Sequence, residues 1–577
     1  MTSTMLAEIS YLNSPLVLAP FTLAIACIFY TYKTKYWAKG MFLHENGYVY
    51  AWKLVQKNSI NIFQTPFTIL GNIFFGYAYS RSQRFGNITT DIILTLNGIF
   101  TCIMVYLITE NSIISPAAMS IYYVYMISTC AIGDSVQPEY LIDFFVFSGI
   151  IISIYALSIE SPLLIFIGAF IGGLSLLVKI NSINSIATCI LILSVNPSIE
   201  YLVPCLLGIS ICCMIFLITL ACSIYFKLES ISHFLSWIKA DTKARYQKKR
   251  ISTIISELFY ALQPVMMLFV FTLLYISMKL TDSYDLFMVY FSVSSLAIVF
   301  IRKATHPTYF SAFALPISFF SAKFIYELIY VNIYNVFVVI LLFSILYFQV
   351  INDTGYKERR QRIERMKREA SLMNGIVIKK MRDIVKSKDP IFGNTHLPQY
   401  YTELETTIPE HFLLVFGYQM HNIIKSENAK TKLLKFFCET LPLFLVIDPN
   451  RTFDIKYFEK SYGAKYEIVF YVKNFFVYRL TERHPQKNDI DLDILFGSTS
   501  IKRCMQDKEA IDTRALTLVD AALIDMENKN SKKALNKLKI AWFLTSNTDI
   551  GKILKEVYTI EKKEENLHTL QESLALL

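Results

Sequence analysis

The sequence predicts a multi-pass α-helical membrane protein that continues into a small soluble α/β domain and a C-terminal helical segment. Two observations predict the membrane part. Apolar residues make up 54% of the 577 residues and only 18% are charged, and the apolar residues gather in runs near the roughly twenty residues that a helix needs to cross a bilayer. A third observation predicts the soluble part, because continuous hydrophobicity ends near residue 355 and a charged run, 356–368, follows.

About eleven apolar runs qualify as membrane spans, and the sixth is short. They lie at 14–32, 90–109, 114–132, 140–158, 161–179, 183–196, 200–226, 256–279, 284–302, 309–328 and 331–351. The first run lacks the basic segment and the small-residue cleavage site of a signal peptide, so we expect it to remain as an anchor. The spans form a predicted membrane domain, 1–355, with a large first loop, 33–88.

Positive charge gathers beside the spans. The formal net charge is +10, and basic clusters lie at 239–250 and 357–368. Anionic lipid headgroups are the natural partners of such clusters, whereas no nucleic-acid recognition motif accompanies them, which argues against a nucleic-acid partner. By the positive-inside rule, these clusters place the odd-numbered loops and the C-terminal part in the cytoplasm.

Behind a basic helical linker, 356–388, the sequence predicts a soluble α/β domain at 389–482. A strand at 441–447 ends in the turn Asp448-Pro449-Asn450, and 466–480 is typical of a strand pair around Lys473-Asn474. From 508 to 577, alanine and leucine recur at helical spacing. This tail resembles one or two tetratricopeptide-type units, which would bind a protein partner, or it is a plain helical cap on the preceding domain.

The first loop carries the cluster His44-Glu45-Asn46-Gly47-Tyr48. A carboxylate held beside a membrane, such as that of Glu45, can act as a general base or bind a metal that holds a phosphate. The alternative is a solvated loop carboxylate next to a surface histidine, His44. The motif by itself leaves both interpretations open.

A second acidic segment lies between the third and fourth spans, on the same membrane face as Glu45 by helix parity. It contains Asp134 and Glu139 in Gly133-Asp134-Ser135-Val136-Gln137-Pro138-Glu139. These carboxylates could complete an acidic site, in which Asp134 and Glu45 are the candidate ligands for a divalent metal. They could equally cap the fourth helix, since acidic residues favour a helix N-terminus.

Two cationic segments fall on that same face. Lys179 ends the glycine-spaced helix 168–179, and Arg302 precedes Tyr309 at the entry to a late span. The cations could hold the phosphate of a polyprenyl carrier. Snorkelling of the lysine and interfacial anchoring by arginine and tyrosine are the competing explanations.

These four segments, in this order over residues 14–350, resemble the GT-C superfamily of polytopic glycosyltransferases, which includes lipid-A aminoarabinose transferases and protein O-mannosyltransferases. The first-loop motif of that family is similar to His44-Glu45, Tyr48, Ala51, Pro66 and Phe85-Gly86. The resemblance implies a GT-C-like fold and transfer of a sugar from a polyprenyl-phosphate donor. It makes Glu45 and Asp134 catalytic and assigns substrate binding to a wider set: His44, Tyr48, Glu139, Lys179, Arg302 and Tyr309.

The chain departs from the family at two points. His44 stands where the family usually has its first acid, and no Trp-Trp-Asp motif occurs, which argues against an oligosaccharyltransferase catalytic subunit. The resemblance also implies a bacterial inner-membrane protein with an extracytoplasmic C-terminal domain, opposite to the orientation that the charge rule favours. We expect the family orientation, because a lipid-phosphate site needs cations on its catalytic face.

Two other functions remain as alternatives to the transferase. A transporter or flippase for a lipid-linked glycan is expected to carry charged groups inside its spans, whereas most ionisable residues here lie at span ends. A non-enzymatic membrane scaffold would depend on the tail, 508–577, and not on Glu45.

Overall fold

The computed structural model forms two compact units. Unit 1 comprises Met1–Trp37, Ala51–Ser230 and Tyr246–Arg365, and unit 2 comprises Ala38–Tyr50, Ile231–Arg245 and Met366–Leu577. The structure describes residues 15–34, 49, 52–53, 69–129, 138–178, 183–227, 252, 255–256, 265–279, 282–302, 311–331, 361, 372–394, 400, 403–406, 427–483, 491–561 and 563–576.

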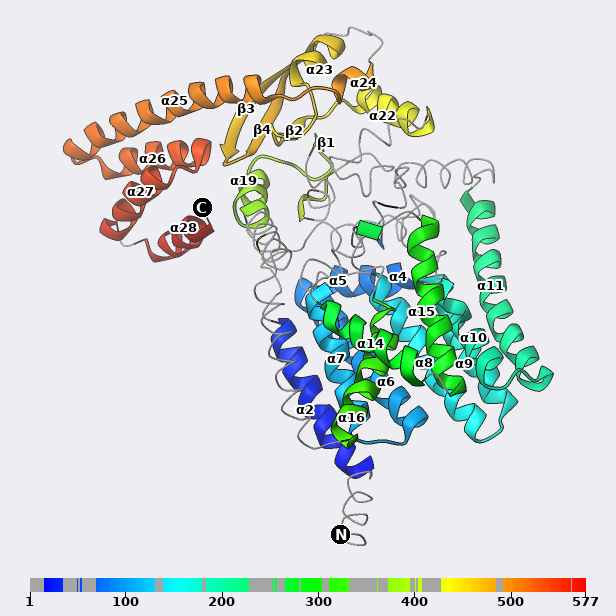
Figure 1. The fold of residues 1–577 in the computed structure, drawn as a ribbon. Coiled ribbons are helices and arrows are strands. Elements are labelled where there is room, and N and C mark those ends of the chain that lie inside the picture. Colours follow the sequence, from blue (N-terminus) through cyan, green and yellow to red (C-terminus); the bar gives the residue numbers. More distant parts are fainter. Residues whose placement is uncertain are drawn as a thin grey trace. The chain divides into compact units, whose positions relative to one another are not determined.

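The described part of unit 1 is helical (Figure 1). Its longer helices are α2 (Pro15–Thr34), α6 (Gln83–Thr109), α7 (Ile114–Thr129), α8 (Pro138–Ser158), α9 (Pro162–Gly173), α10 (Ala187–Val195), α11 (Ile199–Lys227), α14 (Met266–Lys279), α15 (Ser283–Arg302) and α16 (Ala314–Val331). Its shorter pieces are α4 (Ile69–Gly71), η2 (Asn72–Gly76), α5 (Tyr77–Arg81), η3 (Leu174–Leu177) and η4 (Ile183–Ile186).

Three of the described helices are long and apolar enough to cross a membrane: Gln83–Thr109, Pro138–Ser158 and, within α11, Ile199–Thr219. Shorter apolar helices cover Thr22–Thr31, Pro162–Leu177, Asn184–Val195 and Met266–Ser277. All of them coincide with predicted spans, and the predicted span at 331–351 lies almost wholly outside the described residues. Helix α11 exposes most of its apolar side chains, as expected for a helix that faces lipid.

The end of the predicted first loop is helical. Helix α6 begins at Gln83, inside the predicted loop, because the Ser82 hydroxyl accepts a hydrogen bond from the Phe85 amide and caps the helix. The Tyr79 ring of α5 lies against Gly86, where an added Cβ would collide with the ring. The glycine therefore lets α5 fold back onto the first turns of α6.

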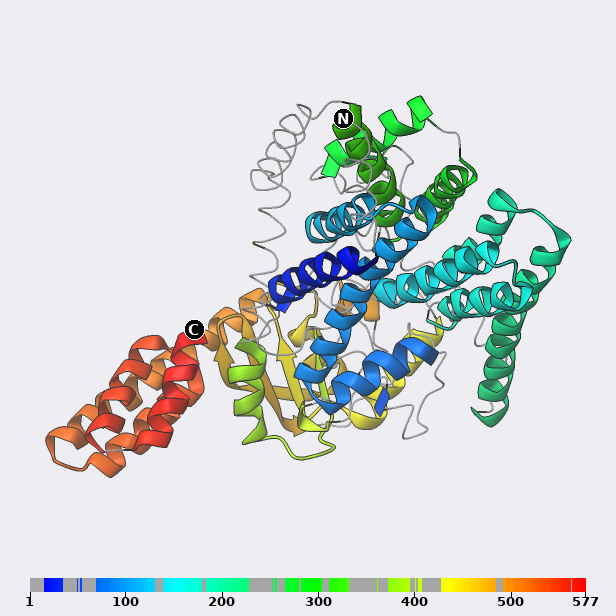
Figure 2. The same cartoon turned by 90° about the horizontal axis from the view of Figure 1, so that it is seen from below.

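Close helix contacts position the middle of unit 1. Helix α8 packs against α6 and α9, and α9 packs in turn against α11; Figure 2 shows α8 to α11 from below. A Cβ added at Gly149 of α8 would lie 2.5 Å from the backbone oxygen of Gly168 in α9. The backbones of α8 and α9 can meet this closely only because both positions are glycine.

Unit 2 contains a four-stranded sheet in the order β1-β2-β4-β3. Its strands are β1 (Ile391–Gly393), β2 (Phe444–Ile447), β3 (Ala464–Val472) and β4 (Phe475–Arg483). Strands β1 and β2 pair in parallel, and the other neighbours are antiparallel. The β3–β4 hairpin turns at Lys473, which has a φ of 49°, so it lies where the sequence predicts a strand pair.

Helices complete unit 2. Those near the sheet are α19 (Ile378–Arg382), which follows η7 (Met373–Val377), α22 (Glu427–Thr440), α23 (Ile455–Tyr462) and α24 (Leu492–Leu495). An array of consecutive helices follows: α25 (Ile501–Glu527), α26 (Ser531–Thr545), α27 (Thr548–Ile560) and α28 (Glu564–Leu576). Each helix of the array packs on the next, as both views show (Figures 1 and 2). Helix α25 begins before the predicted tail, because its first turns pack on β3.

Candidate functional site

Two buried carboxyl groups mark the start of helix α8. Glu139 lies in its first turn and Asp143 one turn later on the same face, and the two side chains are close enough to interact electrostatically. Glu139 is 7% exposed and Asp143 1% exposed. Placing two acidic side chains in the interior of a helical membrane unit is costly, so residues of this kind usually serve a function.

Asp143 connects α8 to the start of another helix. Its carboxylate is hydrogen-bonded by Ser311, a buried residue in the turn before α16. The Oδ2 atom of Asp143 has no hydrogen-bond partner among the described residues. This contact joins the acidic segment of the sequence to the end of the segment that contains Arg302 and Tyr309.

Helix α6 fixes the beginning of α8 from the other side. The side-chain amide of Asn97 donates a hydrogen bond of 2.9 Å to the backbone oxygen of Tyr140. Asn97 is fully buried, and Asp91, also in α6, is 1% exposed. Because a buried amide must satisfy its donors, this bond fixes where the first turn of α8 lies against α6.

A carboxyl pair of this kind can accept a proton, orient a hydroxyl group or attract a cation. Among the described residues, no group of three His, Cys, Asp or Glu side chains could hold a metal ion. The metal ligands that the sequence suggests, Glu45 and Asp134, lie outside the described residues. What Glu139 and Asp143 provide directly is a pair of buried carboxyl groups at one end of α8.

Most of the predicted site residues lie outside the described residues. These are His44, Glu45, Tyr48, Asp134, Lys179 and Tyr309. Arg302 is the last residue of α15, and Glu139 lies at the start of α8. Sequence reasoning missed Asp143, although an isolated acid inside the apolar run 140–158 was the signal that could have identified it.

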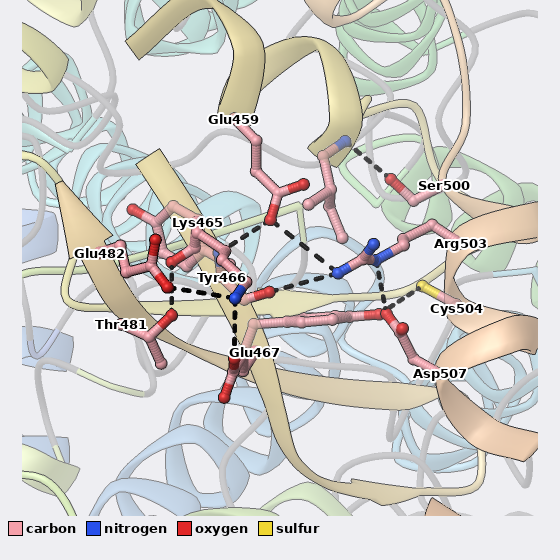
Figure 3. Close-up of polar contacts among 12 residues, drawn as sticks. Glu459, Lys465, Tyr466, Glu467, Thr481, Glu482, Ser500, Arg503, Cys504 and Asp507 are labelled. Carbon is pink, nitrogen blue, oxygen red and sulfur yellow. Dashed lines mark hydrogen bonds and ion pairs between the residues drawn. The ribbon is translucent and has the colours of Figure 1, made fainter. Parts of the chain in front are cut away.

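Unit 2 holds a polar network at the junction of α23, β3 and α25 (Figure 3). Arg503 of α25 lies between Glu459 of α23 and Asp507, with its Nε atom 2.8 Å from an Asp507 oxygen. Glu459 accepts a 2.8 Å hydrogen bond from the Tyr466 amide, and burial raises the pKa of Glu459. The groups bind one another, so the network joins α23, β3 and α25 and leaves no set of groups directed at a ligand.

The comparisons with known proteins concern the fold. No protein-family model matches the sequence, and no curated protein matches it. The solved structures with a similar fold include ArnT from Cupriavidus metallidurans bound to undecaprenyl phosphate, with a TM-score of 0.53 and 9% identity over 82% of this chain and 100% of that chain. The apo state of the same ArnT gives a TM-score of 0.51 and 8% identity over 80% of this chain and 97% of that chain.

The likeness to ArnT extends beyond the membrane part. Unit 1 holds fewer than two thirds of the residues, so a match over 82% of the chain necessarily includes part of unit 2. At 9% identity the likeness shows a common fold and no more. It supports the GT-C-like, multi-pass helical fold that the sequence predicts.

Proposed function

We propose that this protein is a membrane glycosyltransferase that moves a sugar from a polyprenyl-phosphate-linked donor to a lipid, glycan or protein acceptor. The observation that carries the proposal is the fold shared with ArnT, whose solved structure holds undecaprenyl phosphate. The buried acids at the start of α8 also support the proposal, because carboxyl groups can take part in transfer chemistry and Asp143 contacts the turn that leads into α16. The protein would act at the extracytoplasmic face of a bacterial inner membrane.

The proposed mechanism divides the site into an acidic and a cationic part. Glu45 or Asp134 would deprotonate the acceptor hydroxyl or ligate a metal, and Lys179 or Arg302 would hold the donor phosphate. His44, Tyr48, Glu139 and Tyr309 would bind substrate. The acceptor oxygen forms a bond to the sugar carbon, and the polyprenyl phosphate leaves with the electron pair of the broken bond, so a base near the acceptor and cations near the phosphate are both required.

The test is transfer by the purified full chain in lipid nanodiscs, with undecaprenyl-phosphate-linked sugars as donors and membrane extracts as acceptors. Glu45→Gln and Asp134→Asn are expected to lower the rate by roughly a hundredfold or more for whichever acid is the base. Glu200→Gln, an exposed acid at the start of α11, is the matched control. Full transfer in both site variants would exclude both assigned acids.

Orientation is a separate test. A reporter fused after residue 355 is expected to lie outside the cytoplasm, and a cytoplasmic reporter would contradict the proposed face of the site. The same fusion measures whether the positive-inside pattern or the family orientation holds for this chain.

A glycan flippase is the second candidate, because the structure buries an ionisable side chain in the middle of a helix. Lys323 of α16 pairs with Asp285 in the first turn of α15, and transporters place charged groups of this kind in their spans. Proteoliposomes would separate the two functions: transbilayer movement of a lipid-linked glycan without sugar transfer favours the flippase. Loss of function on deletion of 508–577, with Glu45 dispensable, would instead favour a scaffold.

A further inference from the structure

A buried ion pair joins two neighbouring helices of unit 1. The Nζ atom of Lys323 in α16 lies 2.6 Å from an Asp285 oxygen in α15, and these side chains are 15% and 1% exposed. The ammonium group also lies over the rings of Phe319 and Tyr275, 4.8 Å and 5.2 Å from their centroids. Lys323 is therefore held on several sides by groups that favour one position.

Stability alone gives a weak reason for such a pair. Removing two charges from water costs about as much as their attraction returns, and apolar side chains of similar size often serve stability equally well. What a buried pair adds is a single allowed alignment, because any displacement separates charges in a medium of low dielectric constant. The pair is thus better suited to fix a position than to add stability.

Helices α15 and α16 pack against different neighbours, so the ion pair is important for their alignment. Helix α15 packs mainly on α10 and η4, whereas α16 packs mainly on α7 and α14. The two helices are consecutive in the described chain, yet their main neighbours differ, so apolar packing does little to fix one along the other. The Asp285–Lys323 pair is a direct polar connection between them.

A second polar contact extends this connection to the acidic pair. The Ser311 side chain, in the turn before α16, forms a hydrogen bond with Asp143 of α8. Helix α16 is therefore fixed to α8 at one point and to α15 at another. Arg302 is the last residue of α15, so its distance from Asp143 depends on both contacts.

We propose that the Asp285–Lys323 pair is a positioning device that sets the location of Arg302 relative to the acidic start of α8, and so the affinity for the donor phosphate. The inference rests on the proposed function. A slide of α15 by one residue moves Arg302 by about 1.5 Å. A displacement of this size breaks a hydrogen bond between the guanidinium group and the phosphate, and loss of such a charged hydrogen bond weakens binding by roughly tenfold to a hundredfold.

The experiment uses the full chain in nanodiscs and the variants Asp285→Asn, Lys323→Met and the exchanged pair Asp285→Lys with Lys323→Asp. Asp282→Asn is the control, because Asp282 is an exposed acid three positions earlier. The Kd for undecaprenyl phosphate is expected to rise roughly tenfold to a hundredfold in both single variants and to recover in the exchanged pair, with Asp282→Asn unchanged. The donor KM is expected to change in the same way, with little change in kcat.

A purely structural role would give a different result. It would lower the fraction of folded protein, and hence the apparent kcat, while Kd and donor KM stayed at their original values. Unchanged Kd and KM in the folded single variants would overturn the inference. Hydrogen exchange of residues 298–302 and 311–314 gives a second readout that needs no ligand: exchange as slow as in the control would also overturn it.

Failure of the proposed function can be distinguished from failure of the proposed role of the Asp285–Lys323 pair. If the original protein binds undecaprenyl phosphate and transfers no sugar, the transferase assignment fails while the Kd comparison still tests the pair. If the original protein does not bind the lipid phosphate, both the function and the role of the pair in donor binding are overturned.

Discussion

Lys380 of α19 holds the end of helix α26, and its replacement by methionine gives a quantitative test of how unit 2 is assembled. The lysine is 7% exposed. Its Nζ atom donates hydrogen bonds to the backbone oxygens of Trp542 and Phe543, at 3.0 Å and 2.7 Å, and to the Ser546 hydroxyl. The rings of Phe470, Trp542 and Phe543 surround the amine.

The Lys380→Met variant keeps the apolar stem and removes the donor. The last carbonyls of a helix have no partner within the helix. In the variant, the backbone oxygens of Trp542 and Phe543 and the hydroxyl of Ser546 each lose one buried hydrogen bond. An unsatisfied buried group costs about 1–3 kcal/mol. The Trp542 oxygen also accepts a hydrogen bond from the Ser546 amide, so it is not left without a partner. We therefore expect the variant to lower the free energy of unfolding by about 2–4 kcal/mol in total.

Native-state hydrogen exchange of the full chain measures this loss where it occurs. Amides in the last turn of α26 are expected to exchange roughly 30-fold to 700-fold faster, at about 1.4 kcal/mol per factor of ten. Lys379→Met is the matched control, since Lys379 is the exposed neighbour on the same helix. Equal exchange in the two variants would refute the reasoning.

The same lysine makes the stability of unit 2 depend on pH. Burial lowers the pKa of Lys380 well below that of a free lysine, 10.5. Between the folded pKa and 10.5, the unfolded state binds more protons than the folded state, so stability rises with pH in that window and falls as the pH is lowered. Protection of α26 should therefore increase with pH between the folded pKa of Lys380 and 10.5, after correction for intrinsic exchange, and Lys380→Met should remove the slope.

Three further predictions follow from contacts in the two units. Gly149→Ala should destabilise unit 1 by about 1–3 kcal/mol, measured as thermal aggregation in detergent, because the new Cβ meets the Gly168 oxygen. Gly172→Ala should be tolerated, since its nearest contact is 3.4 Å away, and equal effects would argue against the close approach of α8 and α9. Burial raises the pKa of the Cys504 thiol to about 11, so native protein at pH 8 should react with iodoacetamide at the exposed Cys438 and not at Cys504 until it unfolds, as peptide mass spectrometry can show. Arg503→Met should destabilise the junction of α23, β3 and α25 more than Lys502→Met, an exposed neighbour, and equal melting temperatures would contradict that.

Local signals in the sequence sufficed for many elements. The β3–β4 hairpin lies at Lys473-Asn474 because turn residues between two apolar runs specify a hairpin through neighbouring residues. The described apolar helices coincide with predicted spans for the same reason, since a hydrophobic run is a local property. The resemblance to a family of polytopic glycosyltransferases predicted a multi-pass helical fold, and the fold shared with ArnT supports that prediction.

The polar contacts that organise the molecule depended on the tertiary structure. Asp285 and Lys323 are separated by 38 residues, and Lys380 and Trp542 by 162. No local pattern selects such partners, because which carboxylate or carbonyl receives a given lysine depends on how the helices pack. The sequence by itself determined that apolar helices precede a small sheet and a helical array; only the packing of those helices decided that Asp143 meets Ser311 and that Lys380 closes α26.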